Sequence, residues 1–181
     1  MCRIQLILLL LLTVASWKTL AQESETTWER VATKDSIELA KYFKKFQKAF
    51  DLENHQAIRD LSLTGIDCDL CITSDYDLSE PPEDDILPID TFLLKNVKNI
   101  LESKMWEALK ERGYKLSLHK ITNYRTSNLP QNYGSNLELY ELWIQTFLPN
   151  EWAEGHEGQS HAFQFVKLEN QFKFYGITSV P

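Results

Sequence analysis

The sequence has 181 residues, of which 43% are apolar and 25% are charged, with only six Gly and six Pro. This composition excludes a disordered or collagen-like protein, and three cysteines are too few for a disulfide-dense scaffold. The length suits one domain of ordinary size and is short for two. We therefore expect a single soluble globular domain.

The first 21 residues have the pattern of a secretory signal peptide. Arg3 precedes an apolar run over residues 4–15, and Thr19 and Ala21 occupy the positions that a signal peptidase reads. The apolar run is shorter than the roughly 20 residues that a membrane-spanning helix needs. We expect cleavage after Ala21 and export of the product, either to a periplasm or out of the cell, without a stable membrane anchor.

The charge balance argues against a nucleic-acid partner. The expected signal peptide holds two of the 19 basic residues and none of the 26 acidic ones, so the exported chain carries a formal charge of −9. Phosphate backbones are bound by clustered Lys and Arg and are repelled by a negative surface. The one basic cluster, residues 41–48, is interpreted as the solvated face of a helix.

The N-terminal part of the chain predicts a linker and two helices. Residues 22–33 are polar and irregular, as expected of a linker before a domain that spans residues 34–181. An apolar stripe with helical spacing follows, formed by Leu39, Phe43, Phe46 and Phe50. Asp35 and Glu38 predict a capping box at the start of this helix. Residues 54–61 repeat apolar positions with the same period and predict a second, short helix.

The middle of the chain predicts a strand, a loop and a third helix. Residues 66–72 suit a short strand, and residues 73–91 carry seven acids, three prolines and no base, which is typical of a loop. Residues 93–108 show helical periodicity, with Asp90 as the expected N-cap and Gly113 at the C-terminal end.

The C-terminal third predicts an antiparallel sheet. The apolar period changes from 3.6 to two in residues 114–119, and residues 137–148 are rich in aromatic and branched side chains. Residues 161–168 and 171–180 predict a terminal hairpin. The order of elements is that of an α+β protein, in which the sheet must curl around an apolar helix to bury it.

Three segments carry a resemblance to a known family, namely residues 43–50, residues 54–61 and the closing hairpin over residues 163–177. In them the chain resembles the nuclear-transport-factor-two-like superfamily, which includes ketosteroid-isomerase-like and polyketide-cyclase-like domains, and it is similar in particular to small exported bacterial members of uncharacterised role. The resemblance implies N-terminal helices packed in a strongly curved antiparallel sheet, a cone-like half-barrel with a pocket at its open end. Members of the family include enzymes, small-molecule binders and protein-binding modules, so the fold does not decide the function.

The resemblance also implies where catalytic residues would stand. Ketosteroid-isomerase-like members use an Asp general base after the second helix, and an oxyanion site made by a Tyr of the first helix and an acid on a late strand. Tyr42 and Asp67 occupy comparable stretches here, but residues 162–167 hold no acid. The catalytic pattern is therefore incomplete, and Tyr42 is interpreted as an aromatic side chain at the rim of the core or pocket.

Cys68 and Cys71 have three possible roles: a structural disulfide, a redox pair or a metal site. In an exported protein the disulfide is the default. Asp67 and Asp69 flank Cys68, and their negative charges disfavour the thiolate that redox chemistry needs. We therefore favour a structural disulfide.

No metal or cofactor is expected. The four histidines show no familiar zinc-ligand spacing relative to the cysteines. The acids that begin at Asp75 imitate a calcium loop, but Glu80 stands where Gly is required and Ile86 where a bidentate Glu is required. The motifs of serine hydrolases, P-loop nucleotidases and common metalloproteases are also missing from the sequence.

These patterns favour an exported, non-catalytic binding or accessory module with an apolar pocket lined by Tyr42, Phe163 and Phe165. The alternative is a small cofactor-independent lyase or isomerase that acts on a hydrophobic substrate, with Asp67 or His161 as its general base. A third possibility is an interaction protein that binds a protein partner or forms a homodimer through the outer face of its sheet.

Overall fold

The structure is a computed structural model that describes residues 24–68, 71 and 86–180. The described part is a mixed α+β fold with the following elements in chain order: β1 (Thr26–Glu29), α2 (Thr33–Asp51), α3 (His55–Asp60), β2 (Ser62–Cys68), β3 (Ile86–Pro88), α4 (Ile89–Lys95), α5 (Val97–Leu101), α6 (Lys104–Arg112), β4 (Lys115–Ile121), β5 (Leu137–Phe147), β6 (Gln159–Leu168) and β7 (Gln171–Val180). The predicted signal peptide and its cleavage site lie outside the described residues.

The strands form one seven-stranded sheet in the order β1-β4-β5-β6-β7-β2-β3. Five of the six pairings are antiparallel, but β2 runs parallel to β7. The predicted antiparallel pairing of the C-terminal strands is confirmed for β4 to β7, whereas the parallel strand β2 departs from the expected antiparallel sheet. β2 follows α3 in the chain and pairs with β7 at the edge of the β4–β7 meander, where the two strands run in the same direction. The chain then passes through β3 and three helices before it reaches β4.

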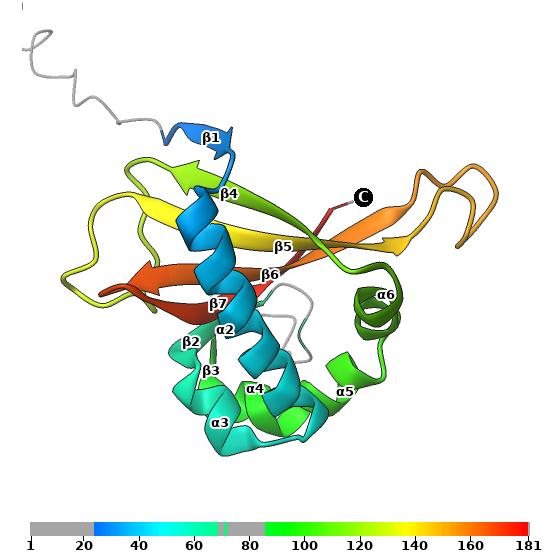
Figure 1. Ribbon diagram of the computed structural model, residues 1–181, viewed down its shortest axis with the longest axis horizontal. Coiled ribbons are helices and arrows are strands. Elements are labelled where there is room, and N and C mark those ends of the chain that lie inside the picture. The colour runs from blue at the N-terminus through cyan, green and yellow to red at the C-terminus, as the bar shows by residue number, and fades with distance from the viewer. Residues whose placement is uncertain (1–23, 69–70, 72–85, 181) are drawn as a thin grey trace, which may run out of the picture.

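Helices cover one face of this sheet, where α2 lies across the strands (Figure 1). The aromatic stripe of α2 packs into the sheet, with the ring centroid of Phe46 4.7 Å from that of Phe174 and 5.5 Å from that of Phe165. The ring centroids of Phe43 and Phe163 are 5.9 Å apart. The predicted amphipathic helix is thus confirmed as the centre of the core. None of the helices in the described part has the length and hydropathy needed to cross a membrane.

A second, smaller core lies on the opposite face of the sheet. The connection between β4 and β5 brings Leu129 and Tyr133 against this face. They meet a set of side chains from β2, β5, β6 and β7: Leu63, Leu137, Leu139, Val166 and Tyr175. Part of the outer face of the sheet is therefore covered by the protein itself.

The start of the first helix differs from the prediction, whereas the second helix agrees with it. α2 begins at Thr33, and Ala32 is its N-cap without a side-chain hydrogen bond, so the capping box at Asp35 is wrong. The Asp35 carboxylate instead accepts hydrogen bonds from Lys167 (2.7 Å) and Tyr140 (3.0 Å), which joins α2 to β6 and β5. α3 is confirmed, and the side chain of Asn54 caps it.

The single helix predicted over residues 93–108 is divided into three short helices, α4, α5 and α6. Helices therefore occur in the middle of the chain as well as near its N-terminus, which corrects the expectation of N-terminal helices alone. Asn96 separates α4 from α5, and Ser103 begins α6 by accepting a hydrogen bond from the Trp106 N–H at 3.2 Å. Asp90 lies inside α4 and pairs with Arg59, so it is not the N-cap. Gly113 ends α6 with a φ of 73°, as predicted.

The structure differs from three further predictions. The proposed linker over residues 22–33 contains β1, which pairs with β4 at the edge of the sheet. The short strand is β2, four residues earlier than the start predicted at residue 66. The predicted loop over residues 73–91 includes β3 and the start of α4, and its remaining residues, 73–85, are outside the described part.

Candidate functional site

A small cavity lies where α5 and the start of α6 meet the ends of β2, β6 and β7. Its volume is about 220 Å³. One part of its lining is apolar and consists of Cys68, Cys71, Ile100, Met105 and Ile177. The other part is polar and consists of Asn96, Asn99, Ser103 and His161. The cavity is therefore mostly apolar with a few polar groups, which is the usual make-up of a small-molecule site.

The apolar wall is set by the register of the sheet. Cys68 of β2 lies opposite Ile177 of β7, and Ile177 lies opposite Phe163 of β6. Because side chains alternate along a strand, His161 projects from the same face as Phe163 and reaches the rim of this wall. The parallel β2–β7 pairing therefore brings the cysteine and the histidine together.

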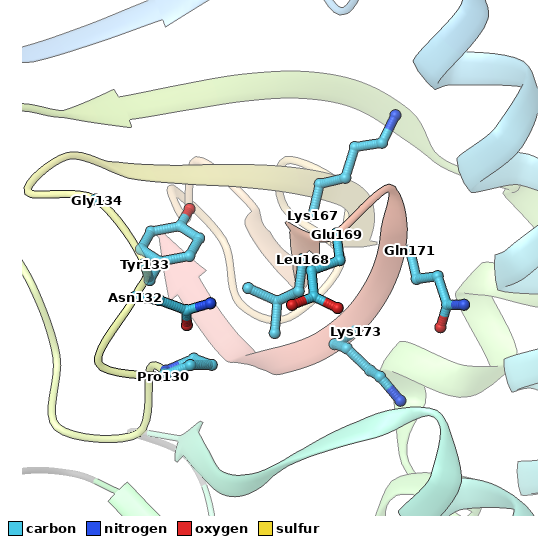
Figure 2. Close-up of a pocket in the computed structure, with 9 residues that line it drawn as sticks. All are labelled: Pro130, Asn132, Tyr133, Gly134, Lys167, Leu168, Glu169, Gln171 and Lys173. Atoms are coloured by element: carbon cyan, nitrogen blue, oxygen red, sulfur yellow. The ribbon is translucent and has the colours of Figure 1, made fainter.

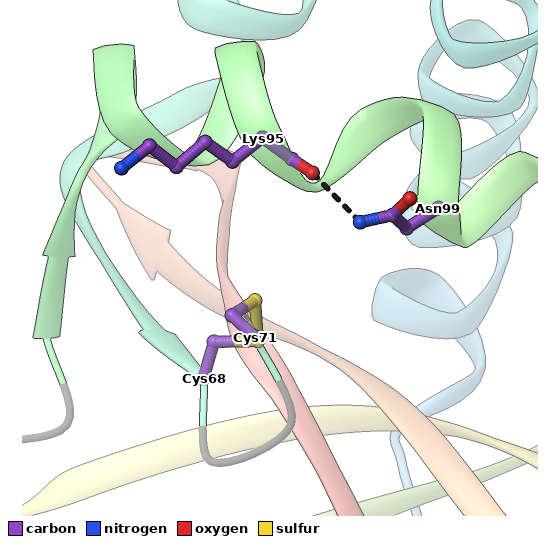
Figure 3. Close-up of a disulfide and its surroundings, with 4 residues drawn as sticks. All are labelled: Cys68, Cys71, Lys95 and Asn99. Carbon is purple, nitrogen blue, oxygen red and sulfur yellow. Dashed lines mark hydrogen bonds between the residues drawn. A yellow bond between two sulfur atoms is a disulfide. The ribbon is translucent and has the colours of Figure 1, made fainter. Parts of the chain in front are cut away.

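The disulfide is part of this wall. The sulfur atoms of Cys68 and Cys71 are bonded to each other, and the bond lies below the α4–α5 connection (Figure 3). The predicted pairing of the two cysteines is present in the structure. Cys68 is 5% exposed and belongs to the core, and Cys71 is partly buried against it.

His161 is the titratable side chain in the cavity lining. Its Nδ1 atom lies 2.7 Å from the hydroxyl of Thr146. Burial lowers the pKa of His161, so the imidazole stays neutral at neutral pH. Thr146 engages Nδ1, whereas Nε2 has no hydrogen bond to another described residue. Nε2 can therefore serve a ligand as a donor or an acceptor, according to the tautomer.

Two other polar side chains of the lining, those of Asn99 and Ser103, are engaged by nearby backbone. The amide nitrogen of Asn99 donates to the carbonyl of Lys95 at 2.9 Å, as Figure 3 shows. The hydroxyl of Ser103 donates to the carbonyl of Ile100 at 2.6 Å. The cavity can therefore take up an apolar body without leaving these donors unsatisfied.

Asp67 does not face this cavity. It precedes Cys68 in β2, so its side chain points to the opposite face of the sheet. There its carboxylate accepts a hydrogen bond from the Tyr175 hydroxyl at 2.8 Å, and the same hydroxyl contacts Thr126. Burial and the nearby Asp67 charge raise the pKa of Tyr175. The two candidate general bases, Asp67 and His161, thus lie in separate environments.

The predicted pocket aromatics belong mainly to the core. Phe163 and Phe165 are fully buried against α2 and line none of the three hollows described in this section. Tyr42 donates a hydrogen bond to the carbonyl of Leu61, and burial raises its pKa. It also lines an open groove of about 430 Å³ between α2 and the β6–β7 hairpin. Of these three residues, only Tyr42 lines a hollow.

A third hollow lies on the other side of that hairpin, against the β4–β5 connection (Figure 2). It has a volume of about 490 Å³, and Tyr133 and Glu169 are among its lining residues. Two lysines at its edge are engaged elsewhere: Lys167 pairs with acids of α2, and Lys173 donates to the backbone of Asp60. Its more polar lining offers less to an apolar ligand than the cavity at His161.

Sequence analysis missed a buried acid on the outer face of the sheet. Glu141 of β5 is 1% exposed and accepts hydrogen bonds from Gln164 (2.8 Å) and Trp143 (3.2 Å). Its carboxylate also lies 3.7 Å from His119, on which the exposed ring of Trp28 stacks. The available signal was an acid placed between the apolar residues Tyr140 and Leu142 in the middle of the strand. Burial raises the pKa of Glu141.

The described residues contain no group of three or more His, Cys, Asp or Glu side chains that could hold a metal ion. No protein-family model and no curated protein matches this chain.

Proposed function

We propose that this protein is an exported binding module that takes a small hydrophobic ligand into the cavity beside His161. The observation that carries the proposal is a half-open hollow with an apolar wall, built from Ile100, Met105, Ile177 and the disulfide, which elements from distant parts of the chain bring together. A neutral imidazole at the edge of this wall supplies one adaptable hydrogen-bonding group.

The size of the cavity favours a compact ligand. An enclosed apolar cavity of about 150 Å³ holds benzene, and this half-open hollow of about 220 Å³ has room for a single ring with one or two substituents. The Nε2 atom of His161 favours a ligand with one hydroxyl or carbonyl. A substituted phenol combines both properties.

Export and an oxidising compartment are part of the proposal. A signal-peptide pattern in residues 1–21 and the bonded Cys68–Cys71 pair both support them. Membership of the nuclear-transport-factor-two-like superfamily, with a sheet curved into a half-barrel, is supported by the order of elements and by α2 packing on the long strands.

A lyase or isomerase remains the second candidate, because His161 lines the cavity with Nε2 available. A general base must come within hydrogen-bond reach of a substrate, and His161 satisfies that requirement for a ligand in this cavity. Asp67 does not, because it is bonded to Tyr175 on the other face. Catalysis would therefore depend on His161 without the second candidate base.

The test uses the exported chain and p-cresol as the probe, with binding measured by calorimetry. Asn99 is exposed and lines the cavity, so Asn99→Trp should block the mouth and abolish binding. Lys98→Trp is the matched control, since Lys98 is exposed on the same helix and does not line the cavity. Equal binding by both variants would place the ligand elsewhere and reject the proposal.

Two isosteric variants separate binding from catalysis. We expect His161→Gln to change the affinity for p-cresol by no more than about tenfold, equivalent to 1.4 kcal/mol. Asp67→Asn should leave the affinity unchanged, because Asp67 faces the other side of the sheet. A screen of hydrophobic carbonyl compounds should show no turnover by the wild type. Any turnover that His161→Gln removes would support the enzyme instead.

A further inference from the structure

The two cysteines in the cavity wall are held in place in different ways. Cys68 is the last residue of β2, is 5% exposed and lies in register with Ile177 of β7. Cys71 lies beyond the strand and is partly buried. Among the described residues, Cys71 is joined to Cys68 by the disulfide and by a long backbone hydrogen bond of 3.5 Å to the Cys68 carbonyl, and its side chain packs against the main core. The disulfide is thus the covalent bond that fixes the Cys71 side chain against Cys68.

This difference predicts what happens when the disulfide breaks. The ladder of β2 and β7 keeps Cys68 in the wall, because its position depends on backbone pairing. The side chain of Cys71 loses its covalent tether and gains rotational freedom that a ligand would have to remove. On reduction, Cys68 therefore keeps its place in the apolar wall, whereas the side chain of Cys71 is no longer fixed to it.

We propose that the redox state of the Cys68–Cys71 pair controls ligand binding, with the oxidised form competent and the reduced form weakened. This inference rests on the proposed function, because it concerns the same cavity. The pair is then a regulatory element of a binding site and takes no part in a reaction on the ligand.

Reduction requires a dithiol as the external reductant. A thiolate of the dithiol attacks the sulfur of Cys71, which belongs to the more exposed residue of the pair. The S–S bond breaks, Cys68 leaves as a thiolate that takes up a proton, and a mixed disulfide remains on Cys71. The second thiolate of the dithiol then displaces Cys71, which also takes up a proton. Two electrons pass to the protein, and the reagent leaves as a disulfide.

Coupling between ligand and disulfide must be reciprocal. A ligand that binds the oxidised form more tightly by some factor makes the disulfide harder to reduce by the same factor. For a two-electron couple, a tenfold difference in affinity corresponds to a shift of about 30 mV in reduction potential. The inference therefore makes two linked quantitative predictions.

The experiment measures p-cresol binding to the exported chain before and after reduction with dithiothreitol. We expect reduction to weaken binding by at least about tenfold, and saturating p-cresol to lower the reduction potential by at least about 30 mV. Cys71→Ser should bind like the reduced protein and should not respond to dithiothreitol. Far-ultraviolet circular dichroism should show that the reduced protein and the variant remain folded.

The outcomes separate this inference from the proposed function. Equal affinity in both redox states, with no shift in potential, would overturn the inference alone. Binding to neither form would reject the proposed function and the inference with it. Unfolding on reduction would assign the disulfide a purely structural role and would also overturn the inference.

Discussion

At the residue scale, the aromatic side chains of α2 do most of the packing in the main core. Phe46 is fully buried and its ring lies within 6.1 Å of the rings of Phe43, Phe50, Phe163, Phe165 and Phe174.

Replacing Phe46 with Ala is expected to cost about 3–5 kcal/mol of unfolding free energy, because it leaves a cavity at the centre of the core. Urea denaturation followed by fluorescence measures this value. Ile37→Ala is the control on the same helix, since Ile37 is exposed and should change stability by less than about 0.5 kcal/mol. A loss below about 1 kcal/mol for Phe46→Ala would contradict this packing role.

Glu141 gives stability a pH dependence. Because burial raises the pKa of its carboxyl, the folded state favours the neutral form more than the unfolded chain does. The contribution of Glu141 to stability is thus fully present below the ordinary range for Glu, and it is lost as the pH rises through the raised value. Glu141→Gln does not titrate, so its stability relative to wild type should improve from acid to neutral pH.

Urea unfolding at several pH values between about 4 and 8 tests this expectation, over a range that brackets the ordinary Glu value. Glu138→Gln, on the same strand but 45% exposed, is the control and should track the wild type more closely. A constant difference between wild type and Glu141→Gln at all pH values would show that this carboxyl does not titrate differently in the two states.

At the scale of elements, the success of sequence analysis depended on how local the determining interaction was. The stripe of α2, the alternation in β4 and the aromatic and branched residues of β5 are properties of neighbouring residues, and these elements were predicted correctly. The division of residues 89–112 into three helices was not predicted, although Ser103 caps α6 with its own side chain. The continuous apolar stripe concealed these breaks.

Long-range pairing explains the remaining differences. β1 is only four residues long with every residue exposed, and it exists because it pairs with β4. The parallel β2–β7 pairing joins residues more than 100 positions apart, and no local pattern indicates its direction. For the site, His161 and the cysteines were found as single candidates, but their meeting in one cavity depends on this pairing.

The same pairing requires a glycine. A Cβ atom at Gly176 would lie 2.0 Å from the backbone oxygen of Asp67, which is too close for any side chain. Gly176→Ala should therefore separate β7 from β2, lower the melting temperature and weaken p-cresol binding. Gly134→Ala is the matched control, because a Cβ there meets no heavy atom within 4 Å. Unchanged melting of Gly176→Ala would contradict the close β2–β7 contact.

At the scale of the whole molecule, export and oxidation should leave chemical traces. Intact-mass analysis of the exported protein should show cleavage after Ala21. Thiol labelling without a reductant should give almost no signal, because cleavage after Ala21 would remove Cys2 and the other two cysteines are bonded. A retained N-terminus would instead indicate an anchored protein, and rapid labelling would indicate free thiols.

The central claim is that this molecule uses the cavity beside His161 to bind a small apolar ligand. Methyl NMR during titration with p-cresol tests it most directly. The account predicts saturable shifts at Ile100, Met105 and Ile177, with small changes at Leu39 in α2, which is outside the cavity lining. Absence of shifts at these three methyl-bearing residues, or shifts centred on another part of the molecule, would contradict it.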